Sequence, residues 1–411
     1  MESQLIDHLF RHHSGKMVSV LTRIFGLEHL DLIEDAVQDT FLKASRAWRN
    51  KKPDHPEAWL TQAAKNRALD LLRKLNTERK HLPTISYGTD AIAINELFLD
   101  TEVEDAQLRM IFTACHPQLD PRDRIAFALK TVSGFSTKEI SSALLTKEDT
   151  IKKRLSRARK AIKNANLQFK IPQGKALPER LDSVMEVLYL IFNEGFHSNK
   201  KERLVQQELC TEAMRLCKIL LKTEHTRTSA TYALFALMCF HSARLDSKTT
   251  TENEILDLEH QDRSQWHFPL IELGNTMMYK ATEAEIFSSY HYEAAIAAEH
   301  LKARHFKDTD WRKIRYWYEC LYNIQPMPTH LLTMSVVSLQ MQDHETSKRY
   351  LDQLSAEDFA HRAYLYYGTL SDYYTATNQK QLALDHIQKA LDHVTNTLEK
   401  AYLLKKKRDL E

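Results

Sequence analysis

The segment "STKEISSALLTKEDTIKKRLSRARKAIK", residues 136–163, reads as two short helices separated by a tight turn. Ser136 and Glu139 stand three residues apart before an apolar run, which is the spacing of a capping box. Thr146 and Asp149 repeat the pattern more weakly. Two capped helices in this order are typical of a helix-turn-helix motif, whose second helix enters the major groove of DNA.

The second of these helices has two distinct faces. Its apolar stripe, at helical spacing, consists of Ile151, Leu155, Ala158 and Ile162. The opposite face carries Lys153, Ser156, Arg157 and Lys160, and at its edges lie Thr150, Lys152, Arg154 and Arg159. Arginine and lysine hydrogen-bond guanine edges, and the flanking bases would neutralise phosphates. A merely solvated basic face is the alternative; the capped helix before it favours DNA.

Composition points to an all-α protein with two or three domains. The 411 residues include only 8 glycines and 10 prolines. The net charge of +2 hides a local excess, because residues 150–170 contain eight lysines and arginines and no acid. Such a confined basic helix predicts one polyanion contact rather than a basic protein surface.

The five cysteines are odd in number and scattered, which argues against a disulfide framework and against a zinc knuckle. The N-terminus has no apolar signal-like region, and no apolar run approaches the length of a membrane span. We therefore expect a reduced, cytoplasmic protein without a membrane partner. No histidine spacing or glycine-rich loop predicts a metal or a cofactor, and no paired carboxylates or nucleophile predict an enzyme.

An N-terminal helical block runs to about residue 80. The segment "DLIEDAVQDTFLKASRAW", residues 31–48, is an amphipathic helix with an acidic edge, either a plain surface or a docking face for a basic partner. The loop "WRNKKPDHPEAW", residues 48–59, and the helix after it interleave bases with tryptophans, a pattern that suits single-stranded nucleic acid. Core packing is the alternative role for the tryptophans.

From about residue 176 onward the sequence predicts consecutive helices, with a repeat near the end. Tyr367, Leu370 and Ala383 have counterparts 36 residues earlier, and a weaker match lies a further 33 residues back. This spacing predicts three degenerate helix-hairpin repeats of the tetratricopeptide (TPR) kind, stacked so that each covers its neighbour.

Three motifs in order carry a resemblance to a known family. Residues 31–48, the segment "AWLTQAAKNRALDLLRKL" (58–75) and residues 119–162 resemble a bacterial sigma factor of the extracytoplasmic-function (sigma-70 group IV) type. The segments "FTACHPQL" (112–119), "ALPERLDSVMEVLYLIFNEGF" (176–196) and "LEHQDRSQWHFPLIELG" (258–274) are similar to the subgroup with a long TPR-like C-terminal extension. The resemblance therefore touches nearly the whole chain.

The resemblance implies a division into domains. Residues 1–78 would form the region 2 bundle, residues 79–104 a linker, and residues 105–168 the region 4 helix-turn-helix domain. Residues 176–411 would form the helical extension, with repeats from about 295. The family usually has glycine in the turn where this chain has Leu145, which makes that turn's geometry an open point.

The resemblance also implies roles for individual residues. The polymerase core, through the β′ clamp helices and β, would be bound by Glu34, Asp35, Gln38, Asp39 and Phe41. The melted −10 strand would be captured by Asn50, Lys51, Lys52, Trp59, Lys65, Asn66, Arg67 and Arg73. The helix 147–163 would read the duplex −35 element through Thr150, Lys152, Lys153, Arg154, Ser156, Arg157, Arg159 and Lys160.

The extension contains one further candidate site. "VLYLIFNEGF", residues 187–196, is an apolar helix that ends in Asn-Glu-Gly, and a plain helix end is one interpretation of it. The alternative is a polar cluster, acting as a latch or a sensor, made of Glu194, His260, Asp262, Arg263 and Trp266. Cys210 and Cys217 share a helix face and are expected to be inert core thiols.

These observations predict a sigma factor that binds RNA polymerase core and directs promoter-specific initiation without being an enzyme. Its extension would be regulatory or would receive a partner protein. The alternative is a helical-repeat scaffold that its N-terminal part tethers to nucleic acid.

Overall fold

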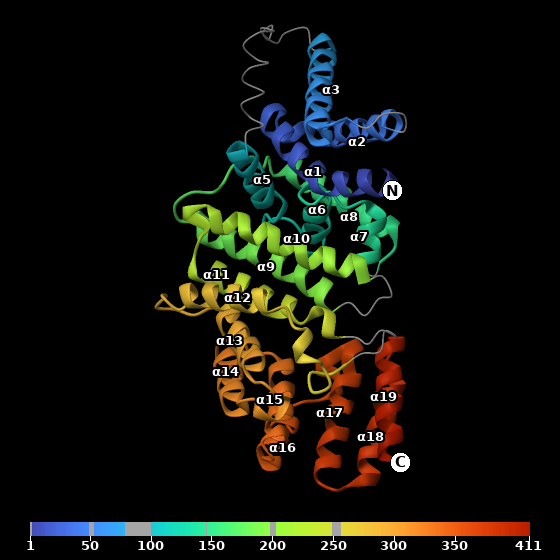
Figure 1. Ribbon diagram of the computed structural model, residues 1–411, viewed down its shortest axis with the longest axis vertical. Coiled ribbons are helices and arrows are strands. Elements are labelled where there is room, and N and C mark those ends of the chain that lie inside the picture. Colours follow the sequence, from blue (N-terminus) through green and yellow to red (C-terminus); the bar gives the residue numbers. More distant parts are fainter. Residues whose placement is uncertain (1, 49–52, 79–99, 145, 198–202, 249–255) are drawn as a thin grey trace. The chain divides into compact units, whose positions relative to one another are not determined.

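The computed structural model describes the chain except for residues 1, 49–52, 79–99, 145, 198–202 and 249–255, and the described part contains helices and no strand (Figure 1). The all-α prediction is confirmed. The helices form two compact units, Met1–Gly195 with Leu204–Leu220, and Phe196–Arg203 with Leu221–Glu411.

The first unit contains ten helices in its described part. They are α1 (Glu2–Phe25), α2 (Leu30–Ala47), α3 (Pro56–Glu78), α5 (Asp100–Ala114), α6 (Pro121–Thr131), α7 (Thr137–Ala143), α8 (Glu148–Asn164), α9 (Ala176–His197) and α10 (Arg203–Lys222), with a short 3₁₀ helix η1 (Leu27–His29) before α2. The long helix α1 packs against α2, α3, α5 and α6. The helices before and after residues 79–99 therefore share one core.

The two ends of helix α6 are set by residues at its boundaries. The Asp120 carboxylate accepts a hydrogen bond from the backbone N–H of Arg122, and Pro121 occupies the first helical position. After the helix, Gly134 has a φ of 72°, a left-handed conformation that glycine adopts without a steric penalty. Pro121 thus begins the helix, and Gly134 lies three residues after its last residue, Thr131. Residues 100–104, predicted as linker, belong instead to α5.

The second unit contains helices that pair along the chain. They are α11 (Ser229–Ala243), α12 (Phe268–Ala281), α13 (Ser289–Lys302), α14 (Trp311–Ile324), α15 (Pro328–Gln340), α16 (His344–Leu351), α17 (Ala363–Ala376), α18 (Lys380–His393) and α19 (Thr397–Leu410). α13 packs on α14, α15 on α16, and α17 on α18. These three hairpins are the predicted repeats.

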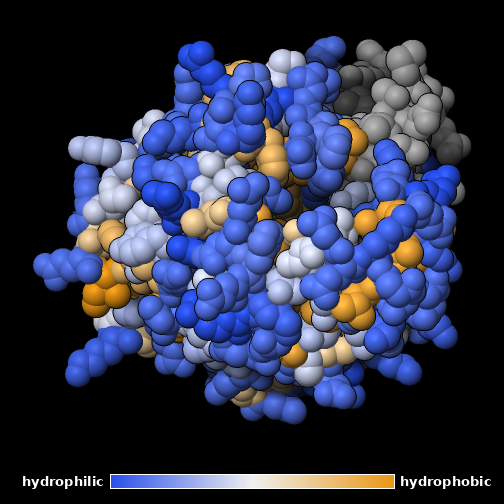
Figure 2. Space-filling view, turned by 90° about the horizontal axis from the view of Figure 1, so that it is seen from below, coloured by the Kyte–Doolittle hydropathy of each residue, from blue (hydrophilic) through white to orange (hydrophobic). Residues whose placement is uncertain are grey.

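Small buried residues lie at the close contact of two of the repeat hairpins. In α15 and α16, Ser335 and Ser347 are fully buried and their hydroxyl oxygens lie 2.8 Å apart. The positions 36 residues later are Ser371 and Ala383, where the Ser371 hydroxyl donates to the Ala383 carbonyl at 2.9 Å. The repeat therefore conserves a close contact rather than large apolar residues. Figure 2 shows a face of the molecule that is mostly hydrophilic, with hydrophobic side chains in small separate patches.

Candidate nucleic-acid and polymerase interface

Helix α8 is oriented by its apolar stripe. Ile151, Leu155, Ala158 and Ile162 are all buried, and α8 packs against α6 and α7. The preceding helix α7 begins with the predicted capping box, in which the Glu139 N–H donates to the Ser136 hydroxyl at 3.2 Å and the Ser136 N–H donates to the Glu139 carboxylate at 2.7 Å. The basic face of α8 therefore points to solvent.

The residues of that basic face differ in their surroundings. Lys153, Ser156 and Lys160 are exposed, and within the described part of the chain neither lysine forms an ion pair. Lys152 lies within 3.6 Å of both Glu148 and Asp149, acids of its own first turn. Arg154 is half-buried and Thr150 half-buried. Lys153 and Lys160 are thus the two cations that lie most open to a DNA groove.

Arg157, predicted to read bases, has an intramolecular partner. Its Nε donates to one Asp123 carboxylate oxygen at 2.9 Å and its Nη2 to the other at 2.6 Å. Asp123 is buried in α6, and its hydrogen bond and charge raise the pKa of Arg157. This bidentate pair fixes α8 against α6, so a contact between Arg157 and DNA would share its guanidinium with Asp123.

The turn between α7 and α8 departs from one expectation. Helix α8 begins at Glu148, and the residue before it, Lys147, supplies no side-chain cap, so the capping box predicted for Thr146 and Asp149 is wrong. Thr146 instead donates its backbone N–H to the Ser141 carbonyl at 3.0 Å. Leu145 lies outside the described residues.

The predicted docking residues on α2 divide into exposed and buried ones. Asp35 and Gln38 are exposed, while Phe41 is only 4% exposed and lies in the core. Asp39 is half-buried and accepts a hydrogen bond at 3.0 Å from Arg67 of α3, a residue predicted for the −10 strand. A partner that docks along α2 would therefore meet Asp35 and Gln38 first.

The predicted −10 residues that the structure describes lie along α3. Trp48 is buried and Trp59 half-buried, with ring centroids 5.5 Å apart in an edge-to-face contact. Lys65 is buried, and Asn66 is exposed and accepts a hydrogen bond from Gln62. Asn50, Lys51 and Lys52 lie outside the described residues, and Arg73 lies in α3 with its side chain undescribed. Core packing is thus the observed role of Trp48.

Glu34 and Arg159 join α2 to α8. The Arg159 Nη2 donates to the Glu34 carboxylate, and the Arg159 Nε lies 2.6 Å from an oxygen of Asp31. The Glu34 side chain is only 13% exposed. Burial raises the pKa of Glu34, and the positive charge of Arg159 opposes that increase. A predicted polymerase-docking residue and a predicted DNA-binding residue therefore bind each other.

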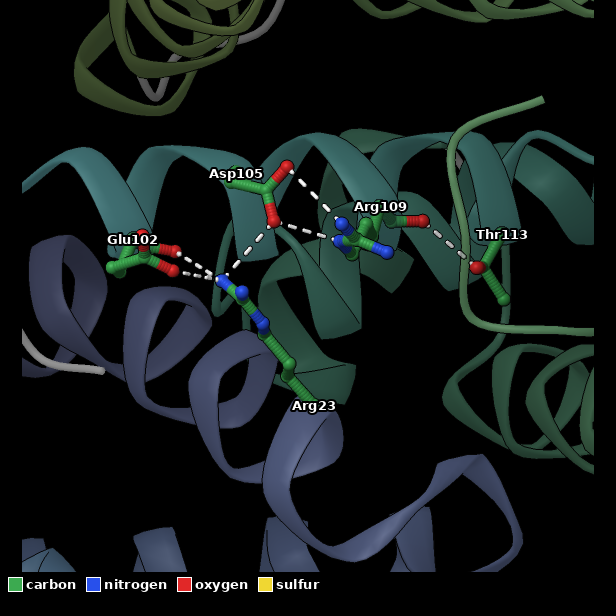
Figure 3. A network of polar contacts seen from close by, with 5 residues as sticks. All are labelled: Arg23, Glu102, Asp105, Arg109 and Thr113. Carbon is green, nitrogen blue, oxygen red and sulfur yellow. Dashed lines mark hydrogen bonds and ion pairs between the residues drawn. The ribbon is translucent and has the colours of Figure 1, made fainter. Parts of the chain in front are cut away.

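A second ionic contact lies between α1 and α5. The Arg23 guanidinium lies 2.5 Å from Glu102 and 3.1 Å from Asp105, and Asp105 also accepts from the Nε of Arg109 at 2.7 Å (Figure 3). Four half-buried charges thus alternate in sign across the boundary between the two helices. This arrangement anchors α5 to the N-terminal bundle.

The segment 112–119 accepts hydrogen bonds from side chains of α9. Arg180 donates to the Phe112 carbonyl at 2.6 Å, and the Ser183 hydroxyl donates to the Cys115 carbonyl at 2.6 Å. Arg124, buried in α6, donates to the carbonyls of Pro117 and Leu119 and to the Ser183 hydroxyl. Sequence reasoning identified the segments 112–119 and 176–196 but not that they bind each other.

Burial in this region shifts two pKa values. It raises the pKa of Cys115 to about 12, so the thiol is neutral at physiological pH. Burial, together with the charges of Arg180 and Arg124, lowers the pKa of His116 to about 4. Cys210 and Cys217 are also buried, as expected of core thiols.

The polar cluster predicted in the extension is brought together only in part. The Arg263 guanidinium stacks 4.7 Å over the Trp266 ring and donates to the carbonyls of His300 and Ala303. His260 contacts Asp257 at 2.5 Å, and Asp262 accepts from the Ser264 backbone and hydroxyl. Glu194 belongs to the first compact unit and the other four to the second.

Within the described residues, no group of three histidines, cysteines or acids is arranged to hold a metal ion. None of the described helices is both long and apolar enough to cross a membrane.

The comparisons with known proteins match three parts of the chain. Residues 9–78 match the model of sigma-70 region 2, residues 109–162 match sigma-70 region 4, and residues 180–282 match a family of unknown function (DUF6596). No solved structure matches. The two sigma models cover α1 to α3 and the helix-turn-helix, which places the fold in the sigma-70 class.

Two relatives extend the comparison. The chain is 30% identical to the uncharacterised protein R00370 of Rhizobium meliloti over 342 residues, which is 82% of this chain and 80% of the relative. It is 27% identical over 158 residues to the RNA polymerase sigma factor SigE of Mycolicibacterium smegmatis, 38% of this chain and 60% of that protein. The chain belongs to the extracytoplasmic-function sigma factors and carries a C-terminal extension.

Proposed function

We propose that the chain is a sigma factor of the cytoplasm in which α2 docks on the β′ clamp helices of RNA polymerase core. The loop before α3 and α3 itself would capture the melted −10 strand, and α8 would read the −35 duplex. The extension would regulate the factor or receive a partner protein. The polymerase performs the chemistry, so the chain itself is not an enzyme.

The observation that carries this proposal is the orientation of α8. Its four apolar residues are buried against α6 and α7, so Lys153, Ser156 and Lys160 project together from the opposite side. A helix 17 residues long is about 26 Å from end to end, which suits the approach of its first turns to a major groove. The capped helix α7 directly before α8 is the arrangement of a helix-turn-helix, which favours DNA reading over a merely solvated face.

In-vitro transcription with purified core polymerase and the full chain tests the assignment. Lys153→Ala with Lys160→Ala should abolish transcripts from a genomic fragment library and leave core binding unchanged. Lys302→Ala with Lys307→Ala removes the same charge from exposed positions of the second unit and is the control. Unchanged transcription by the α8 variant would refute −35 reading by these residues.

The scaffold alternative differs in what it requires of α2. A scaffold has no use for exposed Asp35 and Gln38, whereas a sigma factor should lose core binding when Asp35→Lys and Gln38→Lys are combined. The control Lys43→Glu with Arg46→Glu, also exposed on α2, tests whether any charge change there suffices. Retained core binding by the first variant would favour the scaffold.

A further inference from the structure

Two arginines of the second unit have no acid as an ion-pair partner. Arg244 follows helix α11, and Arg263 is the first residue of the short 3₁₀ helix η4 (Arg263–Gln265). Within the described part of the chain, neither guanidinium takes part in an ion pair. Burial lowers the pKa of Arg263, and the charge of Asp308, which acts from beyond ion-pair distance, opposes that decrease. Two positive charges therefore stand in this part of the fold without a neutralising contact.

The two arginines lie close to each other and to His300. Burial lowers the pKa of Arg244 to about 10, and the charge of Arg263 acts in the same direction, while Tyr318 opposes it. Burial likewise lowers the pKa of His300 to about 3, with further contributions from the charges of both arginines. Like charges brought together away from water favour the binding of an anion between them. We call Arg244, Arg263 and His300 the arginine cluster.

A frame of hydrogen bonds holds the cluster in place. The Arg263 Nη1 donates to two carbonyls at the C-terminal end of α13, at 2.8 and 2.6 Å, and the guanidinium stacks 4.7 Å over the Trp266 ring. The Trp266 Nε1 donates to the buried Ser247 hydroxyl at 2.9 Å, and that hydroxyl donates to the Arg244 carbonyl at 2.9 Å. The frame fixes the Arg263 side chain and the Arg244 backbone, so a ligand would meet donors that are already positioned.

Polar atoms of the cluster remain unused in this frame. The Arg263 Nη2 is buried and has no hydrogen-bond partner among the described residues, and the same holds for the Nδ1 of His300. The Arg244 side chain is half-buried, lies 5.4 Å from the centre of the Phe196 ring, and makes no hydrogen bond with the described part of the chain. Because buried polar atoms are nearly always paired, these atoms indicate an acceptor from outside the chain.

We propose that Arg244 and Arg263 bind a phosphate group, either free phosphate or the phosphate of a small molecule. A phosphate monoester carries about −1.5 to −2 charges at pH 7 and three acceptor oxygens, which match two unpaired arginines. The planar N–H fork of arginine donates two parallel hydrogen bonds to such a group. The neutral His300 ring can donate a further one through Nδ1. A carboxylate, with a single charge, would leave one arginine unneutralised.

The position of the cluster favours a small ligand over the backbone of nucleic acid. Trp266, on which Arg263 stacks, is only 4% exposed, and the Arg263 Nη2 is closed to solvent. The phosphates of a rigid duplex contact side chains that project from a protein surface. A small ligand can instead enter beside the half-buried Arg244. The proposal does not depend on promoter reading and stands apart from the proposed function.

Isothermal titration calorimetry of the full chain at constant ionic strength tests the site. The probes are inorganic phosphate and phenyl phosphate, and we expect saturable binding of at least one of them. Tighter binding of phenyl phosphate would assign the site to a phosphorylated organic molecule, and tighter binding of inorganic phosphate would assign it to the free ion. Acetate should bind at least about tenfold more weakly, because it neutralises one arginine only.

Two matched variants connect the binding to the cluster. Arg244→Gln should weaken phosphate binding about tenfold or more, because it removes a charged donor. The same change should not lower the melting temperature of the free protein, since the side chain makes no hydrogen bond and its loss relieves repulsion. Arg304→Gln removes the same charge from an exposed position after α13 and should bind phosphate like the unaltered chain.

Three results would overturn the proposal. They are the absence of saturable binding by both phosphate probes, unchanged binding by Arg244→Gln, and acetate binding as tight as that of phosphate. Loss of phosphate binding when duplex DNA is present would assign the arginines to DNA instead. Lys153→Ala with Lys160→Ala should bind phosphate normally, so a failure of the proposed function in transcription would leave this result unaffected.

Discussion

Arg124 is one of the residues that connect α9 to region 4. It is 9% exposed, and its guanidinium donates to two carbonyls of the segment 112–119 and to the Ser183 hydroxyl. Glu186 of α9 lies 3.5 Å away and supplies the opposite charge. Charged hydrogen bonds of this kind are stronger than neutral ones, and losing the donor leaves several acceptors unpaired.

Arg124→Met should therefore lower the free energy of unfolding of the first unit by about 3 kcal/mol. Arg122→Met, two residues earlier on the exposed side of α6, should change it by less than about 0.5 kcal/mol. Urea titration followed by circular dichroism measures both. Equal effects would show that Arg124 acts through helix propensity rather than through its acceptors.

His300 makes the second unit sensitive to acid. Burial and the nearby charges of Arg244 and Arg263 lower its pKa to about 3, so the folded protein keeps the ring neutral. The unfolded chain binds a proton near pH 6.5, so stability is present above that pH and is lost as the pH falls toward 3. The loss for this one group is at most about 1.4 kcal/mol per pH unit.

His300→Gln should flatten the decline of stability between pH 6.5 and 4.5, because glutamine takes up no proton. His305→Gln, at an exposed position, is the control. Urea unfolding at each pH gives the slopes, and parallel slopes for His300→Gln and the unaltered chain would count against this assignment.

At the scale of helices, the distance to which two backbones can approach decides which helices pack together. Gly15 and Gly368 both lie within helices, but a Cβ at Gly15 would overlap the Val132 carbonyl, whereas a Cβ at Gly368 would meet nothing within 4 Å. Alanine favours a helix over glycine by about 1 kcal/mol where nothing obstructs it. The same substitution should thus have opposite signs at the two positions.

Gly15→Ala should destabilise the first unit by about 2 kcal/mol, and Gly368→Ala should stabilise the second by about 0.5–1 kcal/mol. Thermal unfolding of the two single variants tests the pair. Stabilisation by Gly15→Ala would show that α1 and α6 move apart at little cost.

The helices themselves were largely predictable, and their partners were not. Pro121, the Ser136–Glu139 box and the stripe through Ile151 are local signals, because capping and periodicity involve residues a few positions apart. The pairing of Arg159 with Glu34 joins residues 125 positions apart, and charge alone did not select that partner for either residue. Arg157 likewise looked free until the fold brought buried Asp123 beside it.

At the scale of the molecule, the first compact unit contains more of the chain than the predicted sigma domains. The extension was expected to begin at 176, but α9 and most of α10 belong to the same compact unit as regions 2 and 4. The similarity of the segments 112–119 and 176–196 to one subgroup was visible in the sequence. Their mutual hydrogen bonds required the fold.

A chain cut after residue 175 should therefore be less stable than one cut after residue 222, although it is shorter. The first cut removes Arg180 and Ser183 and leaves the carbonyls of Phe112 and Cys115 without their donors. Melting temperatures of the two fragments test this, and a higher value for the shorter one would show that α9 is dispensable.

The attachment of α9 to the segment 112–119 also limits the modularity of the chain. A chimera of two sigma factors, in which one DNA-binding domain replaces another, is a way to redirect promoter choice. Here a graft of residues 105–168 alone would carry acceptor carbonyls away from their donors, and the host would keep donors without acceptors. An exchangeable segment must therefore include α9. A graft that is meant to transfer promoter specificity would have to transfer the beginning of the extension with it.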